Sequence, residues 1–122
     1  MEKIVSIRGA ITIKKNNIKE IKDATCILIS ELVKQNNLNE SKIINVIFTA
    51  TNDLDSVNPA TIAREEFKLD SIPMLCVQEM KVKNGLPKCI RVMINVYTSS
   101  SGEMIKHVYI GGAESLRPDL TV

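Results

Sequence analysis

The sequence has little aromatic surface and little excess charge. It contains no tryptophan, two tyrosines and two phenylalanines in 122 residues, and its formal net charge is only +2. Nucleic-acid-binding domains usually combine a strong basic stripe with aromatic side chains on which bases stack. We therefore expect no nucleic acid among the partners of this chain.

Cysteine and histidine are equally sparse. Cys26, Cys76 and Cys89 are far apart, no CxxC pair occurs, and His107 is the only histidine. Such spacing excludes a disulfide framework and lacks the clustered ligands that zinc needs. We expect no bound metal.

No apolar run approaches the length of a membrane span, and residues 1–8 carry charges where a signal peptide would be continuously apolar. We expect a cytoplasmic protein without membrane partners. Apolar residues make up 44% of the chain, which is enough for a core, and the length fits a single domain over residues 1–122.

Hydrophobic periodicity and turn signals predict seven elements. An Asn17 N-cap with Glu20 three residues later begins one helix, Asn58-Pro59 begins a shorter one, and Asn84-Gly85 is a strong hairpin signal. The expected strands are 3–13 (broken at Gly9), 43–51, 73–83, 88–98 and 104–110, the helices are 17–36 and 59–67, and Gly111-Gly112 leads into an extended tail, 116–120.

This order, β-α-β-α-β-β-β, indicates an α+β fold in which a mixed five-stranded sheet packs on one long helix, residues 17–36. The strands are apolar on both faces, as in residues 92–96, and two helices cannot cover five strands. Another copy of the chain is the simplest cover, so we predict a homo-oligomer.

Two charges interrupt the apolar strands. Glu79 and Arg91 face each other across the predicted hairpin if its loop has three residues, whereas a two-residue loop puts them on opposite faces. The pair is either a solvated cross-strand ion pair or a site with one acceptor and one forked donor.

Arginine is used sparingly. Twelve lysines accompany only four arginines, Arg8, Arg64, Arg91 and Arg117. The planar guanidinium suits carboxylate or phosphate, so the four arginines are either reserved for recognition or simply reflect a compositional bias toward lysine. Cys76 is either a structural thiol or a nucleophile without a nearby histidine, and Tyr109 is either a ligand hydroxyl or a wall residue. The sequence has no serine triad, P-loop or GxGxxG motif.

Six blocks together resemble the monofunctional trimeric chorismate mutase of the pseudo-α/β-barrel type, from Ile7 to Leu120 and in the same order. The most distinctive blocks are Cys76-Val77-Gln78-Glu79-Met80 and Lys88-Cys89-Ile90-Arg91-Val92-Met93. The others are Ile7-Arg8-Gly9-Ala10, Pro59-Ala60 with Arg64-Glu65, His107-Val108-Tyr109 and Leu116-Arg117-Pro118-Asp119-Leu120.

The resemblance implies a homotrimer with active sites between subunits, and the Claisen rearrangement of chorismate to prephenate in phenylalanine and tyrosine biosynthesis, without a cofactor. It implies that Arg91 contacts the ether oxygen and the side-chain carboxylate, and that Arg8 and Tyr109 hold that carboxylate. Glu79 with Cys76 would hold the ring hydroxyl.

The resemblance also places Arg64 and Arg117 of a neighbouring chain at the entrance. Further substrate contacts are implied at Ala60, Thr61, Met74, Leu75 and Leu116. Asn58 and Thr61 depart from the family pattern, which has an aromatic residue and a lysine there, so we expect weaker entrance contacts. Two alternatives remain: an imine/enamine deaminase of similar trimeric architecture, and a non-catalytic trimer that binds small anions.

Overall fold

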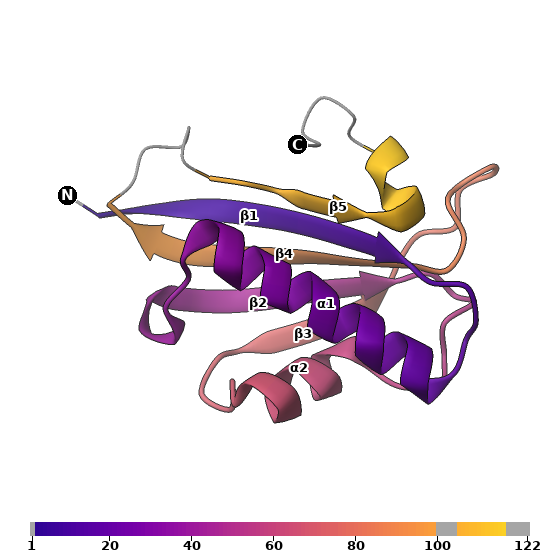
Figure 1. Cartoon of the computed structure of the whole chain (residues 1–122), viewed down its shortest axis with the longest axis horizontal. Helices are drawn as coiled ribbons and strands as arrows, with labels where there is room; N and C mark the ends of the chain where they lie inside the picture. The colour runs from indigo at the N-terminus through magenta and orange to yellow at the C-terminus, as the bar shows by residue number, and fades with distance from the viewer. Residues whose placement is uncertain (1, 100–104, 117–122) are drawn as a thin grey trace.

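A computed structural model describes residues 2–99 and 105–116 (Figure 1). One face of a mixed five-stranded sheet is covered by two helices, and the sheet order is β3-β2-β4-β1-β5. The strands are β1 (Lys3–Thr12), β2 (Ile43–Ala50), β3 (Met74–Gln78), β4 (Cys89–Thr98) and β5 (Val108–Ile110), and the helices are α1 (Ile18–Asn36) and α2 (Pro59–Phe67). The five-stranded mixed sheet predicted from the sequence is confirmed.

Capping side chains begin both helices where the sequence predicts. The Asn17 side chain accepts a hydrogen bond from the Glu20 N–H at 2.8 Å, and Asn58 accepts one from Ala60 N–H at 2.8 Å with Pro59 at the first helical position. α1 ends at Asn37, whose φ of 49° is the left-handed conformation that asparagine tolerates. These local signals explain why the predicted helix boundaries agree with the structure.

The main core lies between the helices and the sheet. Leu28 and Leu32 of α1 are fully buried against strand residues such as Ile7, Phe48 and Ile90. Alternate residues of each strand point to the opposite face, which neither α1 nor α2 covers. In residues 2–99 and 105–116, no helix has the length and hydropathy needed to cross a membrane.

The predicted break of the first strand at Gly9 is wrong, because β1 runs without interruption from Lys3 to Thr12. Gly9 serves packing instead. A Cβ at this position would lie 2.9 Å from Leu32 Cδ1, 3.0 Å from Leu28 Cδ1 and 3.2 Å from the Val108 carbonyl oxygen. The missing side chain lets α1 approach the sheet closely.

The predicted hairpin of residues 73–83 and 88–98 is also wrong. β3 pairs in parallel with β2, and β4 pairs antiparallel with both β2 and β1. Parallel pairing needs a crossover connection, and α2 supplies it between β2 and β3. The Asn84-Gly85 turn does form, with Asn84 at φ 64° and a 2.9 Å bond from Gly85 N–H to the Val82 oxygen. However, the residues on either side of this turn belong to the loop between β3 and β4 and not to paired strands.

The C-terminal expectations are corrected in part. β5 begins at Val108 rather than at Met104, which lies outside the described residues, and it pairs in parallel with β1. Gly111, at φ 65°, ends it as predicted, and it begins a short 3-10 helix (Gly111–Ser115) that was not predicted. Leu116 comes directly after that helix, and residues 117–120 lie outside the described residues.

Substituting Gly9→Ala is expected to destabilise the protein by about 1–3 kcal/mol, because the new methyl group has no room between the sheet and α1. Urea denaturation at fixed protein concentration measures the loss. Leu32→Ala opens space at the same point, so Gly9→Ala should cost less in that background. Additive losses in the double variant would contradict this packing role.

Candidate active site

The candidate site lies on the sheet face that the helices leave uncovered. Backbone pairing puts five residues in one row across all five strands, because each is the register partner of the next. In sheet order, this cross-strand row consists of Val77, Thr49, Arg91, Ala10 and Tyr109. Residues paired directly across a sheet share a face, so all five side chains emerge on the same side.

Arg91 is the charged centre of the row. Its Nε lies 2.7 Å from Oε1 of Glu79, and the side chains are 33% and 21% exposed. The contact meets the distance of an ion pair but not the direction of a hydrogen bond. Thr49 Oγ1 donates a hydrogen bond to the same Glu79 oxygen at 3.0 Å.

The Glu79–Arg91 pair predicted from the sequence is present, but the reason given for it is wrong. The two residues are not on paired strands, since β2 lies between β3 and β4. Glu79 follows directly after β3, where its N–H donates to the Ala50 oxygen at 2.9 Å. Its carboxylate then reaches Arg91 across Thr49.

Arg8 brings a second guanidinium to this face. It is the register partner of Met93, two residues along β4 from Arg91, so the two arginines are diagonal neighbours. His107 holds the Arg8 backbone, because Nδ1 of its ring accepts the Arg8 N–H at 2.9 Å. Two cations and one carboxylate leave this part of the face net positive.

Tyr109 ends the row with a buried hydroxyl group. The residue is 7% exposed and packs in a small cluster with Ala10, Cys89 and Ala113, with Leu116 at its edge. Within the described residues, no group is hydrogen-bonded to the Tyr109 hydroxyl. A buried hydroxyl without a partner is costly, so this group is available to an incoming oxygen acceptor.

A cavity of about 420 Å³ opens beside the ion pair, and its lining includes both Glu79 and Arg91. Loop residues 79–87 form one wall and Thr51, Asn52 and Asp53 another. This size falls within the range of about 300–1,000 Å³ that small-molecule sites occupy.

Hydrogen bonds to Asp53 and Thr51 hold the backbone at the start of β4. Asp53 Oδ1 accepts from the Thr51 hydroxyl at 2.5 Å, and its carboxylate accepts the Lys88 N–H at 3.0 Å. Thr51 Oγ1 in turn accepts the Cys89 N–H at 3.0 Å. These bonds hold Lys88 at its φ of 45° just before β4, three residues from Arg91. Thr49, Thr51 and Asp53 were not among the predicted site residues, because a threonine in a strand and an aspartate in a turn are ordinary.

Several predicted site residues lie elsewhere. Ala60, Thr61 and Arg64 are on α2, and Met74, Leu75 and Cys76 are on the edge strand β3. Met74 and Cys76 pack against the main core, on the face opposite to Glu79, so one chain does not bring Cys76 and Glu79 together. Arg64 is exposed, and Arg117 lies outside the described residues.

The cysteines do not have the properties of nucleophiles. Burial raises the pKa of the Cys76 thiol, and it raises the pKa of Cys89 to about 11. Both thiols are therefore protonated at neutral pH, and the thiolate is the nucleophilic form. The structural interpretation of Cys76 is favoured.

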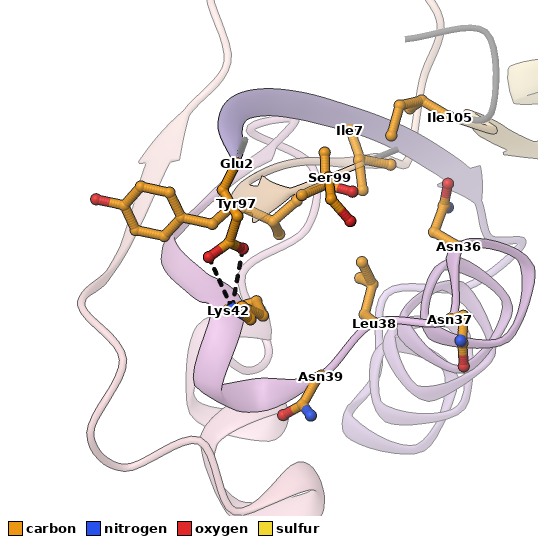
Figure 2. A pocket seen from close by; sticks show the side chains of 12 residues that line it. Glu2, Ile7, Asn36, Asn37, Leu38, Asn39, Lys42, Tyr97, Ser99 and Ile105 are labelled. Carbon is orange, nitrogen blue, oxygen red and sulfur yellow. Dashed lines mark hydrogen bonds and ion pairs between the residues drawn. The ribbon is translucent and has the colours of Figure 1, made fainter. Parts of the chain in front are cut away.

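A second cavity, of about 290 Å³, lies at the opposite end of β1 and β4 (Figure 2). Asn36, Leu38 and Ile105 line it, and at its rim Lys42 pairs with Glu2 at 2.9 Å. None of the predicted site residues lines this cavity, so it is separate from the candidate site.

Comparison with known proteins decides the family. Residues 4–120 match the family model described as chorismate mutase type I. The chain belongs to the chorismate mutase type I family. This confirms the family inferred from the motifs, and with it the expectation of an isomerase of aromatic amino-acid biosynthesis.

Individual chorismate mutases are similar along nearly their whole length. The chain is 38% identical to chorismate mutase AroH of Bacillus subtilis (strain 168) over 119 residues, which cover 98% of this chain and 94% of that protein. It is 36% identical to AroH of Thermus thermophilus, covering 93% of each. A solved chorismate mutase from Clostridium thermocellum superposes with a TM-score of 0.87 at 42% identity, covering 91% of this chain and 98% of that one.

Asp53 should make stability depend on acid pH. Burial alone would raise the pKa of its carboxyl group, but hydrogen bonds from Thr51 and Lys88 outweigh burial and lower the pKa below 3.8. A lowered native pKa stabilises the fold above the unfolded pKa, and that contribution is lost as pH falls through the native value.

Asp53→Asn is therefore expected to lower the melting temperature at pH 7 and to approach the wild type as pH drops below about 4. Melting curves at several pH values and one protein concentration measure the difference. Asp70→Asn is the control, because Asp70 is exposed on the segment after α2. A constant gap between wild type and Asp53→Asn at all pH values would contradict the assignment.

Proposed function

We propose that this chain converts chorismate to prephenate by a Claisen rearrangement, in clefts that neighbouring subunits of a homotrimer share. The observation that carries the proposal is the Arg91–Glu79 ion pair on the uncovered sheet face, with Arg8 as diagonal neighbour and the Tyr109 hydroxyl in the same row. Membership of the chorismate mutase type I family supports the substrate.

The proposed reaction suits the groups that are present. A Claisen rearrangement is concerted, with one carbon–oxygen bond breaking while a carbon–carbon bond forms, and it needs no proton transfer or covalent intermediate. The protein has two tasks: to hold a flexible dianion in its compact conformer, and to stabilise the negative charge that grows on the ether oxygen.

Arg91 is suited to the second task. Its guanidinium carries a positive charge and presents several donors in one plane. Its Nε faces Glu79, and its terminal nitrogens would contact the ether oxygen and the neighbouring carboxylate. The surrounding sheet keeps the Arg91 side chain two-thirds buried, and partial burial strengthens the interaction of a cation with developing charge.

The other groups would hold the substrate. Arg8 would bind the side-chain carboxylate together with the Tyr109 hydroxyl, and the remaining oxygen of Glu79 would accept the ring hydroxyl. The assignment satisfies the Tyr109 hydroxyl, which otherwise has no partner in the part of the chain that the structure describes. It also places the Glu79 carboxylate where a donor, and not an anion, approaches.

An apolar strip beside the row supports the trimer. A second set of register partners consists of Leu75, Ile47, Met93 and Arg8, and it lies next to the cross-strand row on the same face. Leu75 is 63% exposed, Val77 46% and Met93 37%. Apolar side chains gathered on one exposed face mark an interaction surface, and a closed ring of identical subunits covers such a face in every copy.

The remaining site residues fit a neighbouring subunit. Thr61 and Arg64 of α2, together with Leu75 and Cys76 of β3, lie at the far edge of the sheet from Tyr109. If this edge packs against the cross-strand row of the next copy, the entrance arginine and the thiol reach the substrate. Leu116 and Arg117 would complete the entrance.

The two departures from the family pattern concern this entrance. The Asn58 side chain is occupied as the N-cap of α2, and Thr61 has no charge to offer a carboxylate. We expect a raised KM with unchanged chemistry.

Incubating the purified protein with chorismate and following the loss of its absorbance tests the proposal directly. Loss of chorismate with matching formation of prephenate is expected. If the protein does not consume chorismate but hydrolyses a 2-imino acid, the deaminase alternative is supported. If it binds small dicarboxylates without turning them over, the non-catalytic trimer is supported.

Arg91→Lys should reduce kcat by about 10²–10³, because an ammonium cannot span the ether oxygen and the carboxylate as the guanidinium does. Steady-state kinetics with prephenate detection measure the change, and melting temperature and mass in solution check the fold. Lys34→Arg, at an exposed position in the last turn of α1, is the control. Near-normal kcat in folded Arg91→Lys would refute the role of Arg91.

Mixed trimers test the shared cleft. Arg91→Lys and Arg64→Glu damage different halves of the proposed site, so each is weakly active alone. In a random equimolar mixture, about a quarter of the sites combine two intact halves, so about a quarter of wild-type activity should return. Co-expression with two affinity tags yields the mixture. Activity no higher than the mean of the two variants would place all functional groups within one chain.

A further inference from the structure

Thr49 occupies the position between the two charged residues of the site. It is the register partner of Arg91 on one side and of Val77 on the other, so its side chain lies beneath the contact between Glu79 and Arg91. Neighbouring strands are about 4.8 Å apart, so the backbones of β3 and β4 are separated by roughly 10 Å at this point. The two charged side chains bridge this gap only because the residue between them is small.

The Thr49 hydroxyl also supplies direction. The Arg91 Nε contact with Glu79 is close but not aligned as a hydrogen bond, and it would tolerate rotation of the carboxylate. The Thr49 hydroxyl donates to Oε1 at 3.0 Å with hydrogen-bond geometry. Among the described residues, Thr49 is the hydrogen-bond donor to this carboxylate.

The two contacts share one oxygen. Arg91 and Thr49 both engage Oε1, which leaves Oε2 of Glu79 to accept from a substrate. A carboxylate held at one oxygen presents the second in a fixed orientation, so less freedom is lost when a substrate hydroxyl binds.

We propose that Thr49 is a positioning residue that orients Glu79 toward the substrate hydroxyl through its own hydroxyl group. This inference rests on the proposed function, since it names the residue that makes one of its substrate-binding groups effective. Thr49 itself touches Glu79 and does not need to contact substrate.

Thr49→Val and Thr49→Ser separate the hydroxyl from the volume of the side chain. Valine keeps the shape and removes the donor, whereas serine keeps the donor and removes the methyl group. Hydrogen bonds to charged groups are the stronger ones, so Thr49→Val should reduce kcat/KM by about tenfold or more. Thr49→Ser should stay within about threefold of wild type.

Thr25→Val is the matched control. Thr25 is fully buried on α1, far from the uncovered face, and its hydroxyl has no hydrogen-bond partner among the described residues. The same substitution there should leave kcat/KM unchanged.

The outcomes distinguish this inference from the proposed function. If wild type does not convert chorismate, the proposed function fails. If wild type is active and Thr49→Val matches it, or if Thr49→Ser loses as much as Thr49→Val, the positioning role is overturned. Crystal structures of the variants give a readout that is independent of activity. The Glu79 carboxylate should shift or adopt several rotamers in Thr49→Val and keep its position in Thr49→Ser. An unmoved Glu79 in Thr49→Val would also overturn the role.

Discussion

The antiparallel pairing of β4 with both of its neighbours is the constraint on which the site depends. β4 lies at the centre of the sheet, and its register with β1 and β2 fixes which residues flank Arg91. Those residues are Ala10 and Thr49, both small, so the long guanidinium side chain has room on either side. A shift of one residue in either pairing would turn the flanking side chains to the helix-covered face. The hydrogen bonds that Asp53 and Thr51 accept from Lys88 N–H and Cys89 N–H at the start of β4 oppose such a shift.

The sheet thus separates two kinds of surface. On the helix side, β-branched and leucine side chains form a dry core in which a single missing Cβ at Gly9 sets how closely α1 approaches. On the other side, apolar residues alternate with the charged row. Neither face alone accounts for the strand sequences, which are apolar on both sides. The apolar residues of the second face are explained if other subunits cover it. Burial in the assembly would also exclude water from the Arg91 guanidinium and strengthen its interaction with negative charge on the substrate.

Features that depend on residues close together in the sequence could be predicted, and features that depend on residues far apart in the sequence could not. Helix caps at Asn17 and Asn58 and the glycine exit at Gly111 are local, and each was predicted correctly. Strand order is non-local, and the Asn84-Gly85 signal was misleading because a good turn does not require its flanking segments to pair. Glu79 and Arg91 were matched by charge within apolar runs, a signal that survives even when the topology is wrong. Thr49 and Asp53 gave no comparable signal, since a threonine in a strand and an aspartate in a turn are ordinary.

The same reasoning indicates why so few polar groups suffice. A reaction without proton transfer needs no residue whose pKa is tuned to neutrality, and the polar groups are correspondingly few: the Arg91 guanidinium and the Tyr109 phenol in the cross-strand row, with the Glu79 carboxylate beside them. What must be controlled is orientation, and rigid strands control it better than loops do. The carboxylate is the exception, because Glu79 follows β3 at a loop boundary and its side chain must cross a strand to reach Arg91. A directional contact from the intervening strand restrains the carboxylate, and the Thr49 hydroxyl on β2 provides it.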